Sequence, residues 1–435
     1  MKILRNRAFL CGHFAASHEG ILQRMDRAVW KPVEVKQKEY TKNYYFPDFV
    51  DFSYGDPVSL PARRGGKQQD IEATLRFRRA VDKRVTVGIG DGSRAVEVDV
   101  NEVVLYVMPF GLVQFSVEVG MENVEYNDMV AVLQLLRSNC DYVWNEQGKY
   151  TEAEAKQARL HDFVSAAMLP VACLQMCHEP EMPTRMPCYS DLTANGNKLK
   201  LFQIVETEEV EAGLRETVLY NLGCLAPMQE PIVPQKGSYY ERTMEEGQVS
   251  VFEGWSALAL FDSFTMLSEP QPDFRRDIWA NDYFGMIYIY ELYRQAFLYH
   301  YNGLFRMKRC DIVKLESDIL LFERRYRFER FSYNFLPLEI GRAMERALEL
   351  EESTQALRSM VTQASAVYDK ESDERMNTVM TGLTLITLCS TVWDLFSLLE
   401  VAIVPDNGAS FYRLGVGILV LALAILALVL LRRRR

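Results

Sequence analysis

Residues Arg375–Glu400 read RMNTVMTGLTLITLCSTVWDLFSLLE, an apolar and hydroxyl-rich stretch with one acid in its interior, Asp394, and a second, Glu400, at its end. A helix of this length can cross a bilayer, whose hydrocarbon core is about 30 Å thick. A carboxylate at the bilayer centre costs about 2.5–3.5 kcal/mol, so an intramembrane acid normally faces water or a partner. The sequence therefore predicts a first transmembrane helix over residues 376–404, with a functional acid inside it.

A second apolar run follows a short segment of turn residues. Residues 414–431, LGVGILVLALAILALVLL, carry no charge and are long enough to cross most of a bilayer. The intervening residues 405–413, PDNGASFYR, predict an external loop. Positive charge directly after a span favours the cytoplasmic side, and the chain ends in Arg432, Arg433, Arg434 and Arg435. We therefore expect a multi-pass protein of the cell (inner) membrane with both the N-terminus and the C-terminus in the cytoplasm.

The amino-acid composition argues against some classes of binding partner. The chain has 435 residues, of which 49% are hydrophobic and 25% charged, so it can bury a sizeable core. Its formal net charge is −10, which argues against DNA or RNA binding because phosphate neutralisation needs concentrated Lys and Arg. Small cations are the more natural partners.

The remaining residues divide into two regions. Residues 1–234 predict a mixed α/β domain, with a hairpin in VVLYVMPFGLVQFSVEV that turns at Pro109–Gly111 and a helix over 130–140. Residues 235–375 predict a helical region, with apolar spacing of three and four over 287–330 and again over 338–368. The expected fold class is an α+β cytosolic domain, long stalk helices and a C-terminal two-helix transmembrane hairpin.

The start of the first predicted span contains a recognisable motif. Asn377, Met380, Leu383 and Thr384 follow the pattern N-x-x-M-x-x-L-T. With the long helix before it and the basic tail after the second span, this segment resembles the CorA family of divalent-cation channels. The resemblance implies a homopentamer in a lipid bilayer, with the first membrane helices around a central pore. It also implies a divalent cation such as Mg²⁺ as the transported or regulatory ion, and no other cofactor.

The chain departs from that family at the end of the pore helix. The family has Gly-Met-Asn there, whereas this chain has Leu399–Ile403, with the sequence LEVAI. Magnesium selectivity is therefore not implied, and the expectation is limited to cations in general.

In the first predicted span, helical spacing places several residues on one face of the helix. Steps of three and four place on it a set of residues that the resemblance makes pore-lining: Asn377, Met380, Leu383, Thr387, Thr391, Asp394 and Leu398. In a ring of subunits Asp394 would form an acidic collar that binds a metal cation. Alternatively, Asp394 is protonated at a helix contact and bonded to Thr391 or Ser397. Glu400 is expected at the outer mouth.

Other motifs carry weaker hypotheses. Residues 87–93, VGIGDGS, fit a hairpin turn better than a phosphate loop, because strand-like residues follow and a Walker lysine is missing. The aromatic segment 283–305 contains charges and predicts an amphipathic helix rather than a third span. Zinc-capable side chains occur at a spacing that fits no common module, so a buried helix is the alternative: Cys173, Cys177, His178 and Cys188. The sequence shows no catalytic constellation and predicts no enzyme.

Two functions remain open at this level. The first is a CorA-like oligomeric membrane channel or transporter for cations, gated by its cytosolic domain. The second is a ligand-gated membrane effector of a bacterial defence system, opened by a small cytosolic nucleotide messenger.

Overall fold

The computed structural model describes most of the chain outside one long central gap. The described residues are 1–15, 27–33, 41–55, 71–89, 94–137, 199–208, 213–252, 254–306 and 311–403, with short pieces at 18, 22, 25, 141–142, 144–145, 158–159, 210–211 and 417. The described chain divides into two compact units, residues 1–310 with 317–357, and residues 311–316 with 358–435.

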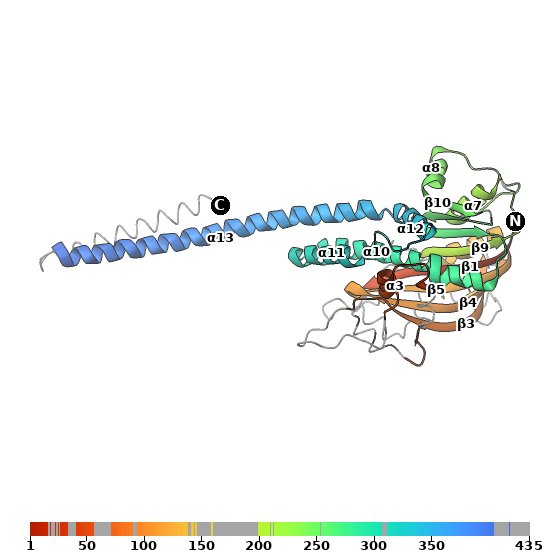
Figure 1. Ribbon diagram of the computed structural model, residues 1–435, viewed down its shortest axis with the longest axis horizontal. Coiled ribbons are helices and arrows are strands. Elements are labelled where there is room, and N and C mark those ends of the chain that lie inside the picture. The colour runs from red at the N-terminus through yellow and green to blue at the C-terminus, as the bar shows by residue number, and fades with distance from the viewer. Residues whose placement is uncertain are drawn as a thin grey trace. The chain divides into compact units, whose positions relative to one another are not determined.

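A large mixed sheet organises the first unit (Figure 1). Its strand order is β10-β11-β12-β9-β1-β5-β4-β3-β2, with β7 also pairing with β3. All pairs are antiparallel except β12 with β9, which is parallel. The strands are β1 (Lys2–Ala15), β2 (Lys31–Pro32), β3 (Leu75–Ile89), β4 (Arg94–Met108), β5 (Leu112–Glu125), β7 (Trp144–Asn145), β9 (Lys200–Thr207), β10 (Gln248–Phe252), β11 (Trp255–Leu260) and β12 (Ser263–Ser268), and a separate pair joins β6 (Asp141–Tyr142) to β8 (Ala158–Arg159).

The hairpin predicted from sequence is confirmed. Strands β4 and β5 pair antiparallel on either side of a short turn at Pro109–Gly111. Phe110 and Gly111 have φ values of 63° and 67° at this turn. Local chemistry therefore determines this part of the fold, since a Pro and a Gly occupy the turn between two alternating apolar runs.

The sheet buries both faces, because successive side chains of a strand point to opposite sides. Leu10 and Leu201 belong to an apolar core that also contains the buried side chains of helices α4 (Tyr126–Arg137) and α7 (Arg215–Cys224). On the alternate positions Phe9 stacks on Phe202 at 5.3 Å between ring centroids. Phe202 in turn lies 6.0 Å from Tyr288 of helix α10 (Phe284–Phe305). The first face is thus mainly aliphatic, and aromatic rings stack on the second.

The region predicted as helical contains several helices. They are α8 (Ser238–Gly247), α9 (Asp273–Asp277), a π-helix (Ile278–Tyr283), α10, α11 (Ile312–Tyr326), α12 (Phe335–Ala347) and α13 (Leu350–Ile403). The short helix α3 (Pro47–Ser53) contributes Phe49 and Phe52 to an aromatic cluster with Tyr290 and Phe328. The sheet also takes β10, β11 and β12 from beyond residue 234.

The apolar face predicted along 338–368 is buried only in its first part. Ile340, Met344 and Leu348 are buried, as are Leu357 and Val361. A break between α12 and α13 interrupts this face, at a point where Glu349 adopts a φ of 52°. Helix α13 then continues for 54 residues without interruption through Arg375.

The predicted transmembrane hairpin and the multi-pass membrane localisation are corrected by the structure. Among the described residues, none of the helices is both long enough and apolar enough to cross a bilayer. Hydroxyl groups recur along the part of α13 that had been expected to span it, and Asp394 adds a carboxylate. Five threonines there donate to the backbone carbonyl four residues earlier: Thr378, Thr381, Thr384, Thr387 and Thr391.

The rest of that prediction falls outside the described residues. This applies to the loop at 405–413, to the basic tail at 432–435 and, apart from Gly417, to the apolar run at 414–431.

Candidate functional site

An aromatic pocket in the first unit is the strongest candidate site. Its volume is about 500 Å³, which lies within the usual range of about 300–1,000 Å³ for small-molecule sites. Strands β10 and β11, helix α9, the π-helix and the start of α12 all contribute to it. The lining residues are Tyr44, Phe252, Gly254, Trp255, Gln271, Arg275, Ile278, Trp279, Tyr283, Phe284 and Leu336.

Three aromatic side chains form the inner wall. Trp255 on β11 is 6% exposed, and its ring centroid lies 5.5 Å from that of Phe284. Trp279 lies 5.9 Å from Phe284 and 6.2 Å from Trp255, with tilted ring planes. Trp279 is only half-buried. A planar ligand ring can therefore stack on Trp279 while Trp255 and Phe284 hold it in place from behind.

A π-helix and a glycine fix the position of Trp279. The six residues Ile278–Tyr283 form a π-helix that leads directly into α10. A Cβ added to Gly285 would lie 1.7 Å from the backbone oxygen of Ala280, so a side chain at that position would force the backbone to shift. Single-turn π-helices occur often at functional sites, and here the turn carries Trp279 and Tyr283 into the pocket.

Arg275 is the charged residue of the lining. Its Nη1 donates to Oε1 of Gln271 at 2.8 Å. Among the described residues it has no carboxylate partner, and the described lining contains no Asp, Glu, His or Cys. The described lining therefore offers positive charge and aromatic faces. This arrangement suits binding of an anionic planar molecule.

An acid lies just behind the wall. Asp282 is 8% exposed and accepts a hydrogen bond from the hydroxyl of Tyr54 at 3.0 Å. Burial raises the pKa of Asp282, while the hydrogen bond from Tyr54 and the charge of Arg76 oppose that change. Asp282 therefore anchors the π-helix to Tyr54 at the end of helix α3 and does not contribute to the lining.

A second cavity of about 450 Å³ is less suited to a ligand. Its wall includes Arg137 and Asp262. Nη2 of Arg137 lies 3.8 Å from a carboxylate oxygen of Asp262, and the buried Lys200 lies 3.5 Å from the other. Burial lowers the pKa of Lys200 to about 8. The charges at this cavity already contact one another.

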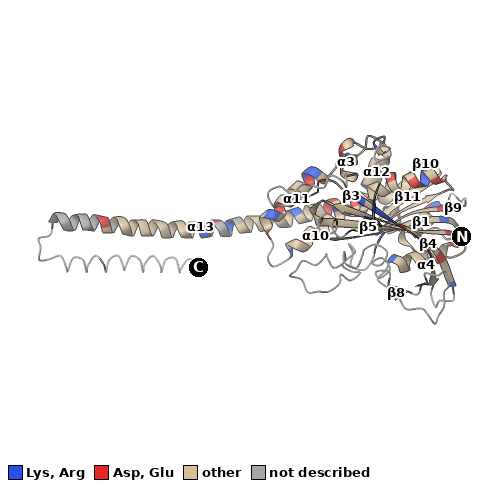
Figure 2. Ribbon diagram, turned by 90° about the horizontal axis from the view of Figure 1, so that it is seen from below, with Lys and Arg blue, Asp and Glu red and all other residues tan. Residues whose placement is uncertain are grey.

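The residues predicted as pore-lining lie on α13. The side chains of Asn377, Met380, Leu383, Thr387, Thr391 and Asp394 are exposed, and Leu398 and Glu400 belong to the same helix. In Figure 2 most of α13 beyond its charged middle section is uncharged. Helical spacing places the predicted pore-lining residues, without Glu400, on one face. A ring would require further copies of the chain.

The zinc hypothesis concerns residues 173–188, which fall outside the described part. Within the described ranges no group of three His, Cys, Asp or Glu side chains could hold a metal ion. Residues 87–89 end strand β3, which pairs antiparallel with β4, and the other residues of the Gly-rich run are not described. The sequence did not reveal the aromatic pocket, because its walls come from four separate segments between Tyr44 and Leu336.

Comparison with known proteins does not assign this chain to a family. Neither the protein-family models nor the curated protein sequences that were searched match this chain. The resemblance to CorA channels stays a prediction that rests on the residues of α13.

Proposed function

We propose that the chain is a ligand-controlled, self-associating protein whose first unit binds a small nucleotide. The observation that carries the proposal is the pairing of an aromatic wall with Arg275 in one pocket. A nucleotide base can stack on Trp279, and the phosphate can accept hydrogen bonds from the Arg275 guanidinium. The proposal corresponds to the messenger-gated alternative drawn from the sequence.

The polarity of the pocket supports this ligand class. An apolar ligand would leave the Arg275 guanidinium without a charged partner, whereas a phosphate can accept two hydrogen bonds from it. The absence of carboxylates from the described lining favours an anion over a cation. Stacking of one base contributes about 1–3 kcal/mol, as judged from alanine substitutions.

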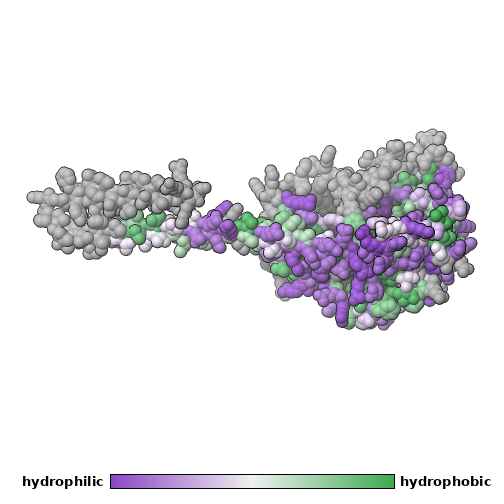
Figure 3. All heavy atoms as spheres, turned by 90° about the horizontal axis from the view of Figure 1, so that it is seen from above, coloured by the Kyte–Doolittle hydropathy of each residue, from purple (hydrophilic) through white to green (hydrophobic). Residues whose placement is uncertain are grey.

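Helix α13 supports the self-associating part. Five large apolar residues recur on one face at spacings of three or four, with exposures between 54% and 68%: Met376, Val379, Met380, Leu383 and Ile386. Figure 3 shows hydrophobic surface on the helix beyond a hydrophilic section. An apolar helix face of this kind is buried when helices from several copies pack together. A pentamer is the number of copies implied by the CorA resemblance.

Cation binding remains a prediction within this proposal. Asp394 lies about two helical turns beyond Ile386, the last residue of the apolar face, so its copies would approach one another in a parallel assembly.

The binding half of the proposal is tested with simple probes. Intact protein is titrated by calorimetry with the four ribonucleoside 5′-monophosphates AMP, GMP, CMP and UMP. At least one is expected to bind, and Trp279→Ala should weaken that binding about tenfold or more. Phe274→Ala is the matched control, because Phe274 is an exposed aromatic residue of α9 that does not line the pocket. The proposal fails if no nucleotide binds, or if both substitutions have the same effect.

A further inference from the structure

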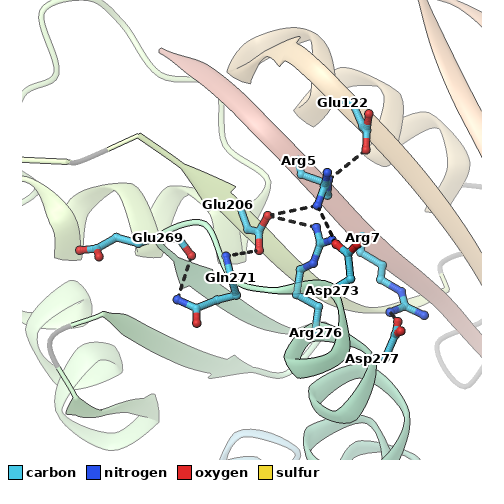
Figure 4. A network of polar contacts seen from close by, with 9 residues as sticks. All are labelled: Arg5, Arg7, Glu122, Glu206, Glu269, Gln271, Asp273, Arg276 and Asp277. Carbon is cyan, nitrogen blue, oxygen red and sulfur yellow. Dashed lines mark hydrogen bonds and ion pairs between the residues drawn. The ribbon is translucent and has the colours of Figure 1, made fainter.

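A polar network connects the sheet to the turn that carries Arg275. Figure 4 shows Glu206, near the end of β9, among side chains from β1, β5 and the segment 269–277. Glu206 is 3% exposed. A buried carboxylate needs several partners to compensate for the loss of water, so its contacts indicate what it holds in place.

Glu206 holds the backbone of that turn. Its Oε1 accepts a hydrogen bond from the backbone N–H of Gln271 at 3.0 Å. Its Oε2 accepts one from Nη1 of Arg276 at 3.2 Å and lies 3.9 Å from Nη1 of Arg5. One carboxylate thus fixes the residues on both sides of Pro272 and Asp273.

Gln271 links Glu206 to the pocket. Its Nε2 donates to the backbone oxygen of Glu269 at 3.2 Å, and its Oε1 accepts from Nη1 of Arg275 at 2.8 Å. The backbone of Gln271 is therefore held by Glu206 while its side chain holds Arg275. Both Gln271 and Arg275 line the pocket, and Glu206 does not.

The network also determines which charged side chains of the turn are paired with one another. Arg276 is paired with Glu206 and Asp273, and Arg7 pairs with Asp277 at 2.6 Å. Arg5 reaches Glu122 at 2.9 Å as well as Asp273 at 3.4 Å. Of the two adjacent arginines, Arg276 is thus neutralised by carboxylates, whereas Arg275 is held by a neutral amide. This leaves the charge of Arg275 for a ligand.

We propose that Glu206 is a positioning residue that sets how strongly the pocket binds the anionic group of its ligand, acting through Gln271 and Arg275. The inference rests on the proposed function. The positioning effect of Glu206 and its negative charge have opposite effects on the affinity for an anion. Removing the carboxylate of Glu206 takes negative charge away from the site, which by itself would strengthen binding of an anion. Loss of positioning would weaken it.

The test compares each nucleotide with its nucleoside in Glu206→Gln. We expect the affinity for the nucleotide to fall about tenfold, as for the loss of about 1.4 kcal/mol, while the affinity for the nucleoside stays unchanged. In an Arg275→Gln background, Glu206→Gln should have no further effect on the nucleotide. Asp277→Asn is the matched control, because it neutralises a carboxylate of the same turn that contacts Arg7. Tighter nucleotide binding, equal losses for nucleotide and nucleoside, or additive effects with Arg275→Gln would each overturn the inference.

A ligand-free measurement separates this inference from the proposed function. In the ¹H–¹⁵N spectrum of the intact protein, the guanidinium N–H signals of Arg275 are expected to exchange slowly in the wild type and in Asp277→Asn. Glu206→Gln should accelerate that exchange, and Gln271→Ala should accelerate it equally. If no nucleotide binds to the wild type but the exchange rates behave in this way, the proposed function fails and the positioning role holds. Unchanged exchange in Glu206→Gln removes the positioning role.

Discussion

The first unit and helix α13 differ in how far their side chains find partners within the chain. In the first unit even the buried charges have partners within the chain: Arg294, 6% exposed, donates to Glu291 at 2.8 Å and to Glu345 at 2.6 Å. Beyond Arg358, α13 exposes large apolar residues such as Ile386, at 68%. The first unit thus stabilises itself, whereas under our proposal the apolar face of α13 gains stability by association with other copies. Substitutions in the first unit should change the free energy of unfolding, and those on α13 should change the oligomeric state.

The largest effect is expected at Gly285. Gly285→Ala places a Cβ 1.7 Å from the backbone oxygen of Ala280, which neither the π-helix nor α10 can accommodate without a backbone shift. We expect unfolding in urea to show a loss of about 4 kcal/mol or more. Gly303→Ala in the same helix is the control, because nothing lies within 4 Å of its added Cβ. Equal stabilities of the two variants would contradict the tight packing of the π-helix.

The next effect is expected at the buried ion network. Arg294→Met removes the cation that Glu291 and Glu345 share, leaving a buried carboxylate without a counterion. The expected loss is about 3 kcal/mol in urea unfolding. Arg342→Met removes an exposed ion pair with Glu339 on α12 and should have little effect. A small loss in both variants would show that the network contributes no more than a surface pair.

A pH-dependent effect is expected from Glu291. Burial raises its pKa to about 7, against the opposing charge of Arg294 and with a further contribution from Glu345. In the unfolded chain the carboxyl titrates near pH 4.5. The folded protein therefore holds an extra proton between these values, so the contribution of this group to stability is complete below pH 4.5 and is lost as the pH rises through about 7.

Glu291→Gln, which cannot titrate, tests this contribution. Urea unfolding at pH 5, 6, 7 and 8 should show the wild type losing stability relative to the variant as the pH rises. Parallel stability profiles for the two proteins would mean that the carboxyl is already ionised throughout this range.

The smallest effect on the first unit is expected from α13. Leu383→Glu replaces a side chain that is 54% exposed, so the unfolding free energy of the first unit should change by no more than about 0.5 kcal/mol. Sedimentation should nevertheless show that the oligomer dissociates. Thr381→Glu, on roughly the opposite face of the helix, is the control and should leave the assembly intact. If Leu383→Glu sediments like the wild type, this face does not hold the copies together.

Local signals in the sequence were sufficient for part of the fold. The turn at Pro109–Gly111 and the continuous helix through Arg375 depend on neighbouring residues, and both are present. The break at Glu349 was not predicted because the apolar spacing continues across it from Met344 to Leu357. The membrane prediction was wrong because it relied on the apolar residues of α13 and gave too little weight to its hydroxyl groups.

The candidate site could not be predicted in the same way. Trp255 and Trp279 are 24 positions apart and meet only because β11 and the π-helix lie against each other. Arg275 and Arg276 are adjacent residues of the same type, so the sequence alone does not distinguish their roles. In the folded sheet Glu206 pairs with Arg276, whereas Arg275 contacts Gln271 and lines the pocket. A dense aromatic segment around Tyr283 was visible, but its role as a pocket wall depends on non-local contacts.

The most direct test of the central claim is the affinity ratio between each ribonucleoside 5′-monophosphate and its nucleoside, measured by calorimetry for wild type and Arg275→Gln. We predict that at least one nucleotide binds the wild type at least about tenfold more tightly than its nucleoside, since a charge-assisted hydrogen bond contributes about 1.5–3 kcal/mol. Arg275→Gln should abolish this preference while leaving the nucleoside affinity unchanged. Absence of nucleotide binding to the wild type, or the same preference in Arg275→Gln, would contradict the account.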